Sequence, residues 1–138
     1  MELVRRNSDY ALRSLAYMAE FPNGRKFTIR AIAKKEDVPA AFLGKIFQRL
    51  SLNKIVTSCR GPGGGFYLLK KPHQLTLKEI LEVTQGRISL SDCLFDSKLC
   101  NRARACKINA ALSNIQNRLI NLLDKYTLKD FIADNQKR

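Results

Sequence analysis

Three cysteines lie close together in the C-terminal half of the chain, at Cys93, Cys100 and Cys106. Six residues separate the first pair and five the second, which is wider than the two-residue spacing of zinc ribbons and thioredoxin-type redox motifs. Basic residues favour thiolates and offset the negative charge of a thiolate-ligated centre. The segment carries four of them: Lys98, Arg102, Arg104 and Lys107. The three thiols are therefore candidate metal ligands or redox thiols, one short of the four ligands that such a centre usually takes.

Four uses of these thiols are considered: an iron–sulfur cluster, oxidant sensing by thiol chemistry without a metal, zinc binding, and a small thiol enzyme. The enzyme is disfavoured because no histidine lies near the cysteines as a base, the single histidine being His73. The fourth cysteine, Cys59, is expected to be a small packed residue in a strand. The N-terminus lacks the apolar core of a signal peptide, so a cytoplasmic location is expected, where structural disulfides are rare. No apolar run approaches the ~18 residues of a membrane span.

The segment 28–71 predicts a pair of helices followed by a hairpin. Thr28 is placed to cap a first helix. After a turn at Val38-Pro39, apolar residues recur at helical spacing in a second helix: Leu43, Ile46, Phe47 and Leu50. A helix pair followed by a hairpin is the plan of a winged helix-turn-helix, a DNA-binding fold.

The hairpin prediction rests on the run Arg60-Gly61-Pro62-Gly63-Gly64-Gly65, because four glycines in six residues exclude a helix. Its flanks, 55–59 and 66–69, are β-branched, aromatic or aliphatic, as strands require. Arg60 stands where it could enter a narrow minor groove.

Charge supports a polyanionic partner. The chain has 25 basic and 12 acidic residues, a net charge of +13. Segment 25–71 holds eleven basic and two acidic residues, or +9. The outer face of the second helix is small and basic, which suits close approach to DNA, although a solvated surface helix is the alternative. The candidate DNA contacts are Thr28, Ala40, Ala41, Phe42, Gly44, Lys45, Gln48, Arg49, Arg60, Gly61, Pro62, Gly63 and Gly64.

Further helices are predicted on both sides of this unit. Ser8-Asp9 is a plausible cap for an N-terminal amphipathic helix that ends before Pro22. Thr76 and Glu79 form a capping-box pattern at the start of a short helix that Gly86 ends. A short terminal helix begins after Thr127.

A long C-terminal helix carries apolar residues at alternating spacings of four and three, typical of a helix-to-helix contact. They are Ile108, Leu112, Ile115, Leu119, Leu122 and Tyr126. A dimer contact is expected, the alternative being packing on its own domain. The predicted fold is mainly α with a small β-hairpin. Its units are a winged helix-turn-helix domain (1–86), a cysteine-containing cluster-binding loop (87–107), and a dimerisation helix with a short terminal helix (108–138).

Nearly the whole chain resembles the bacterial winged-helix repressors that include IscR and NsrR, many of which carry an iron–sulfur cluster. The resemblance is carried by the sequences at 9–13, 42–50 and 124–128, by the specific wing motif at 60–66, and by the three cysteines. It implies a homodimeric transcription factor, a repressor that binds a pseudo-palindromic DNA operator. Its DNA affinity would depend on a cluster that senses nitric oxide, redox or iron status and is held by Cys93, Cys100 and Cys106.

The resemblance also suggests the fourth ligand. IscR-type members have a histidine three residues after the last cysteine, where this chain has Asn109, a poor iron ligand. NsrR-type members use an aspartate of the partner subunit, at the position of Asp9. The expected cluster, 4Fe–4S in preference to 2Fe–2S, is therefore held by the three cysteines and by Asp9 of the other subunit.

Overall fold

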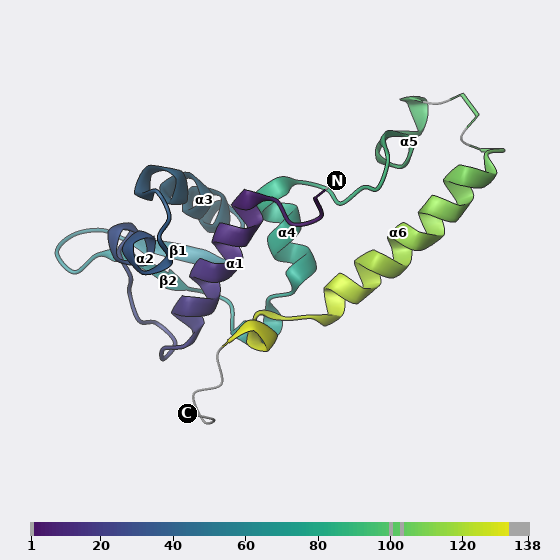
Figure 1. Cartoon of the computed structure of the whole chain (residues 1–138). Helices are drawn as coiled ribbons and strands as arrows, with labels where there is room; N and C mark the ends of the chain where they lie inside the picture. The colour runs from purple at the N-terminus through teal and green to yellow at the C-terminus, as the bar shows by residue number, and fades with distance from the viewer. Residues whose placement is uncertain (1, 100, 103, 133–138) are drawn as a thin grey trace.

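The computed structural model describes residues 2–99, 101–102 and 104–132 (Figure 1). Cys100 lies outside the described residues. The α-helices and strands are α1 (Arg6–Ala19), α2 (Ile29–Glu36), α3 (Ala40–Leu52), β1 (Val56–Cys59), β2 (Gly65–Leu68), α4 (Leu77–Gln85), α5 (Asp92–Phe95) and α6 (Lys107–Lys125). The described residues also form the 3₁₀ turns η1 (Pro72–Gln74) and η2 (Ser97–Leu99) between these elements, and η3 (Leu128–Phe131) after α6.

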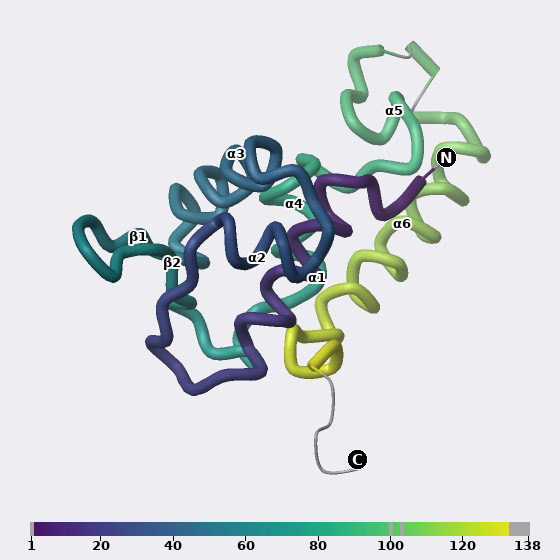
Figure 2. Tube along the Cα trace, turned by 60° about the vertical axis from the view of Figure 1, so that its left-hand side comes forward, coloured from purple at the N-terminus to yellow at the C-terminus, as the bar shows by residue number. Residues whose placement is uncertain are grey.

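Helices α1 to α4 pack around one apolar core, and the hairpin lies at the end of that body opposite to α6 (Figures 1 and 2). Leu15, Ile32, Phe47, Leu50 and Ile55 are fully buried in this core. The helical spacing of apolar residues in the sequence is what directs these faces inward. The winged helix-turn-helix prediction is confirmed.

The helix pair has the predicted boundaries. Thr28 Oγ1 accepts a hydrogen bond from Ala31 N at 3.1 Å and so caps α2. Helix α2 ends at Asp37, whose φ of 54° lies in the left-handed region, and Pro39 then precedes the first residue of α3. This short turn sets the orientation of α3 on α2.

The wing is a two-stranded antiparallel hairpin in which Val56 pairs with Leu68 and Cys59 with Gly65. Strand β1 begins at Val56, one residue later than the sequence predicts, and β2 begins at Gly65, one residue earlier. Phe27 adds a bridge to this sheet, because its N–H donates to Phe66 O at 2.8 Å and its carbonyl accepts from Phe66 N at 2.7 Å. A Cβ at Gly65 would collide with the Phe27 carbonyl, so glycine is needed for this approach.

The expected Ser8-Asp9 cap is wrong. Helix α1 begins earlier, at Arg6, and the fully buried Ser8 Oγ lies 2.6 Å from Thr84 Oγ1 on α4. Gln85 Oε1 accepts from the Arg5 backbone N–H at 3.0 Å, which satisfies a donor at the helix start. The Gln85 side chain on α4, far away in the sequence, therefore accepts from the start of α1, where a local capping side chain was expected.

Helix α4 is capped by Thr76, whose hydroxyl accepts from Glu79 N at 3.1 Å, and Gly86 ends it with a φ of 89°. The Glu79 carboxylate binds Lys70, so only half of the expected capping box forms. The terminal 3₁₀ turn η3 has the complete box, between Thr127 and Asp130.

Helix α6 extends away from the body and contacts it mainly through α4 (Figure 1). A second apolar cluster forms there, with Leu81, Ile88 and Leu123 buried and Leu119 packed against them. Leu119 is half-buried and packs partly against its own domain, and its predicted place in a dimer contact stays a prediction.

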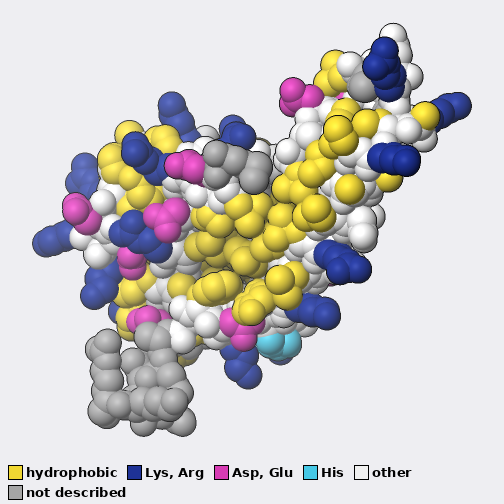
Figure 3. All heavy atoms as spheres, turned by 45° about the vertical axis from the view of Figure 1, so that its right-hand side comes forward, with side chains coloured by type: hydrophobic (Ala, Val, Ile, Leu, Met, Phe, Trp, Pro, Cys, Tyr) yellow, Lys and Arg dark blue, Asp and Glu magenta, His cyan; other side chains and the backbone are white. Residues whose placement is uncertain are grey.

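The rest of the predicted stripe is largely uncovered. Ile108, Ile115, Leu122 and Tyr126 are 71%, 54%, 51% and 47% exposed, and Leu112 is half-buried. Figure 3 shows apolar side chains in a band along α6 that continues onto the adjoining body. We call Ile108, Ile115, Leu122 and Tyr126 the α6 stripe.

The described part of the cysteine segment is not loop alone. It contains the short helix α5 and the turn η2, and α5 contacts α6. Within the described residues, no helix is both long and apolar enough to span a membrane.

Candidate DNA-binding surface and cysteine site

Helix α3 presents most of the candidate DNA contacts on one side because Leu43, Ile46, Phe47 and Leu50 bury the other. Ala40, Ala41, Lys45, Gln48 and Arg49 are exposed, Phe42 is 37% exposed, and Gly44 is half-buried.

This outer face has two halves. Phe42, Lys45 and Arg49 follow one another at spacings of three and four, which places them in one row. That row is turned toward α1 and α4: the Phe42 ring contacts the Tyr10 ring edge-on at 5.6 Å, and Arg49 Nη1 donates to Thr84 O at 3.1 Å. The second half, Ala41, Gly44 and Gln48, carries small or uncharged side chains. Arg49 thus has an intramolecular partner that its position in the sequence did not reveal.

The wing tip lies between the two strands. Arg60, Gly61, Pro62 and Gly63 are exposed and Gly64 is half-buried. Gly64 N donates to Gly61 O at 2.8 Å, and Gly61 and Gly63 have φ values of 93° and 73°, which disfavour other residues. A tight glycine turn therefore holds Arg60 at the end of the hairpin.

The wing packs against α3 through two aromatic rings. The ring of Phe66 on β2 meets that of Phe47 on α3 at a centroid distance of 5.2 Å. Because Phe47 is fully buried, this contact packs the base of the wing against the core side of α3.

Two of the three candidate ligand cysteines converge on the start of α6. Cys106 is its N-cap residue, and Cys93 Sγ accepts a hydrogen bond from Asn109 Nδ2, in the first turn, at 3.4 Å. Both thiols are half-buried and free. The N-terminal end of a helix favours negative charge, so it suits thiolates.

Cys93 has a second partner, since Ser91 Oγ lies 3.2 Å from its sulfur. The hydrogen bonds of Ser91 and then Asn109 lower the pKa of the Cys93 thiol. The sequence assigned Asn109 only as a poor iron ligand and missed this role. No local pattern signals it, because Cys93 lies sixteen residues earlier in the chain.

Asp9 lies on α1, exposed, and pairs with Arg13 at 3.4 Å. Arg13 also binds Glu36 at the end of α2, with Nε 3.4 Å from Oε2. Within the described residues, no three histidine, cysteine or acidic side chains gather as a metal site. Asp9 of the same chain is therefore not brought together with Cys93 and Cys106.

The chain matches the family model Rrf2, described as an iron-dependent transcriptional regulator, over residues 4–134. It belongs to the Rrf2 family. Membership confirms the resemblance to winged-helix regulators and makes the chain a transcriptional regulator rather than an enzyme.

Solved structures share the fold. CymR, the global cysteine regulator of B. subtilis, is 24% identical, with a TM-score of 0.74 over 95% of this chain and 96% of that one. A transcriptional regulator from Listeria innocua is 23% identical, with a TM-score of 0.75 over 93% and 84%. IscR of T. potens is 18% identical, with a TM-score of 0.68 over 97% and 94%.

Proposed function

We propose that this Rrf2-family regulator is a cytoplasmic homodimeric repressor whose affinity for a pseudo-palindromic DNA operator is controlled by an iron–sulfur cluster. The observation that carries the DNA-binding half is the packing of the wing against α3 through Phe47 and Phe66. It supports insertion of α3 in a major groove while Arg60 reaches the adjacent backbone or minor groove.

Dimer formation is supported by the α6 stripe. Ile108, Ile115 and Leu122 lie seven residues apart, which keeps them on one side of the helix, and Tyr126 follows as its C-cap residue. A symmetric pair of α6 helices would cover them and set two copies of α3 on two half-sites.

The donor chemistry supports a cluster. Two free thiols lie at one helix start, and the third ligand, Cys100, comes from the segment between them. In this proposal Cys93, Cys100, Cys106 and Asp9 of the partner subunit hold the cluster, 4Fe–4S in preference to 2Fe–2S. When bound, the cluster supplies reactivity toward nitric oxide, oxidants or changes in iron supply.

The hydrogen bonds of Cys93 also favour a second function, oxidant sensing by the thiol without a metal. The lowered pKa of Cys93 makes it a better nucleophile at neutral pH.

The two functions are tested by anaerobic purification followed by a visible spectrum and iron and sulfide analysis. A brown protein with sulfur-to-iron bands and stoichiometric iron supports the cluster. A colourless, iron-free protein whose DNA binding changes with peroxide, reversibly with a thiol reductant, supports thiol sensing.

DNA binding is tested separately by selecting duplexes from a random library and footprinting the winner. The proposal expects a two-fold symmetric footprint with half-sites about one helical turn apart or a multiple of it. An asymmetric single site, or no selection above random duplex at fixed salt, contradicts it.

A further inference from the structure

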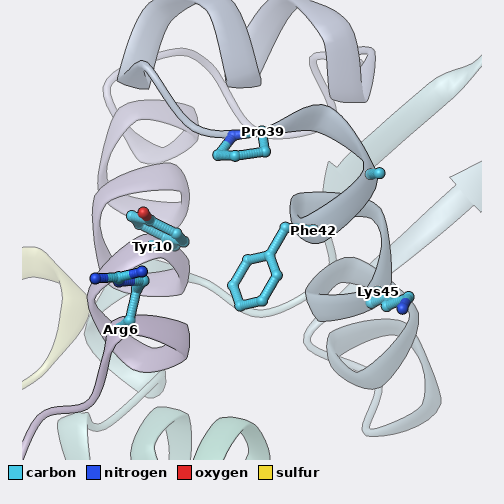
Figure 4. A pocket seen from close by; sticks show the side chains of 6 residues that line it. Arg6, Tyr10, Pro39, Phe42 and Lys45 are labelled. Carbon is cyan, nitrogen blue, oxygen red and sulfur yellow. The ribbon is translucent and has the colours of Figure 1, made fainter.

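A cavity lies between the first helix and the start of the DNA-reading helix. It has a volume of about 350 Å³ and is lined by Arg6 and Tyr10 from α1 and by Pro39, Ala41, Phe42 and Lys45 at the start of α3 (Figure 4). This size is at the lower end of that of small-molecule sites, about 300–1,000 Å³.

The lining combines apolar surface with positive charge. The Tyr10 and Phe42 rings, perpendicular and 5.6 Å apart, supply aromatic surface, and Pro39 and Ala41 extend it. Figure 4 shows the two rings directed toward one another across the gap between the helices. Arg6 lies one helical turn from Tyr10, and no acidic residue is among the six that line the cavity.

Of the two acidic residues next to this charge, Asp9 is already paired. Glu2 and Asp9 line an adjacent open hollow with Arg6, but the Asp9 carboxylate pairs with Arg13 at 3.4 Å. The start of α3 adds to the positive potential, since the side chain of its N-cap residue, Pro39, makes no hydrogen bond to the first turn.

We propose that this cavity binds a small carboxylate carrying an aromatic ring, and that its occupation competes with DNA for α3. The ring lies against Tyr10 and Phe42, and Arg6, on the same helix as Tyr10, binds the carboxylate (Figure 4). Since a water molecule takes about 30 Å³, the volume holds on the order of ten heavy atoms, the size of phenylacetate. A phosphate group of DNA has the charge but no apolar body to cover the two rings.

Competition follows from shared residues. Phe42 and Lys45 line the cavity and are also among the candidate DNA contacts of α3. A ligand against the first turn of α3 occupies the space that the edge of a major groove requires. This step rests on the proposed DNA-binding function, whereas binding of the carboxylate does not.

Calorimetric titration at constant ionic strength tests the site, with phenylacetate and indole-3-acetate as probes. Phenylacetamide lacks the charge and acetate lacks the ring. Saturable binding of at least one probe is expected, with both controls about tenfold weaker or more. If neither probe saturates, or if acetate binds as tightly as phenylacetate, the proposal is wrong.

Variants then localise the site. Arg6→Gln is expected to weaken probe binding about tenfold, whereas Arg5→Gln removes the same charge one residue away, outside the cavity, and leaves binding unchanged. Tyr10→Leu separately removes one ring and weakens the aromatic probes more than acetate. Equal losses in the Arg5 and Arg6 variants, with unchanged thermal unfolding, would indicate general charge attraction and overturn the assignment.

Fluorescence anisotropy with a selected DNA duplex tests competition. Phenylacetate near its own dissociation constant should roughly double the protein concentration needed for half-saturation, while acetate at equal ionic strength should not. Simultaneous binding of probe and DNA overturns the competition alone. Absence of DNA binding without any probe contradicts the proposed function and leaves the calorimetric result standing.

Discussion

The Asn109 side chain on α6 donates a hydrogen bond to the sulfur of Cys93 on α5. At the level of single residues, such contacts set the reactivity of a thiol and the orientation of a charged side chain. Arg49 is held by the Thr84 carbonyl, while Arg60 stands exposed at the wing tip. The following two predictions concern Cys93 and Arg60.

The first prediction concerns the pH at which Cys93 reacts. Hydrogen bonds from Ser91 and Asn109 favour the thiolate, so in cluster-free protein alkylation of Cys93 should begin below the pH usual for a thiol. Asn109→Ala removes one donor, raises the pKa and shifts the pH–rate profile of iodoacetamide labelling upward. Peptide-level mass spectrometry measures the rate, with Asn114→Ala, on the same helix, as control. Identical profiles for both variants would contradict the role of Asn109.

Arg60 is the side chain expected to read DNA from the wing. Arg60→Ala should lose on the order of 1–3 kcal/mol of binding to a selected duplex at fixed salt. Arg118→Ala removes an equal charge from the exposed surface of α6 and should change affinity less. If the two variants bind the DNA duplex with equal affinity, Arg60 contributes only through the overall positive charge of the protein.

At the scale of elements, α3 and α6 each have one face committed to the core and another left uncovered. In α3 the uncovered face is small and basic, whereas in α6 it is apolar. The same burial pattern thus leaves one helix suited to a polyanion and the other to a second apolar helix. Two substitutions separate these roles from folding stability.

Gly44 gives α3 a flat surface at a cost in helix stability. No described atom lies within 4 Å of a Cβ built there, so Gly44→Ala should stabilise the free protein by ~0.5–1 kcal/mol. If α3 sits close to base edges, the added methyl group should weaken DNA binding by about 1–3 kcal/mol. Thermal unfolding and anisotropy measure the two effects. Stabilisation without loss of DNA affinity would place Gly44 away from the interface.

Ile115 tests the dimer contact of α6. It is 54% exposed in the single chain, so Ile115→Glu should leave the fold intact but bury an unpaired charge in a dimer, at a cost of several kcal/mol. Sedimentation should then give the mass of one chain. Asn121→Glu, at an exposed polar position of the same helix, is the control and should remain a dimer. An intact Ile115→Glu dimer would move the interface elsewhere.

At the scale of the whole molecule, local patterns predicted the elements but not the contacts between distant segments. Thr28, Gly86 and the glycine-rich tip act within a few residues, and each was predicted correctly. The start of α1 depends instead on Gln85, and the orientation of Leu119 depends on Leu81 and Ile88. A periodic apolar pattern shows that a helix buries one face, but not whether its own domain or another chain covers it.

The last prediction concerns the fourth ligand, which only a two-chain arrangement could supply. Within one chain, Asp9 pairs with Arg13 and is not brought to the cysteines. If Asp9 of the partner subunit completes the site, a heterodimer of an Asp9→Ala subunit and a Cys93→Ser subunit contains one complete set. The cysteines come from the first subunit and the aspartate from the second. If the aspartate acted within its own chain, the same heterodimer would contain none.

Two affinity tags isolate the heterodimer anaerobically, and iron per dimer and the visible spectrum measure its cluster. Ligation across the interface predicts about half of the wild-type absorbance, with wild-type band shape and resistance to chelators. Both homodimeric variants lack any complete set and should lose the cluster faster. If the spectrum and chelator resistance of the heterodimer equal the average of the two homodimeric variants, Asp9 does not ligate across the interface. If the cluster of the Asp9→Ala homodimer is the same as in the wild type, Asp9 serves only in its ion pair with Arg13.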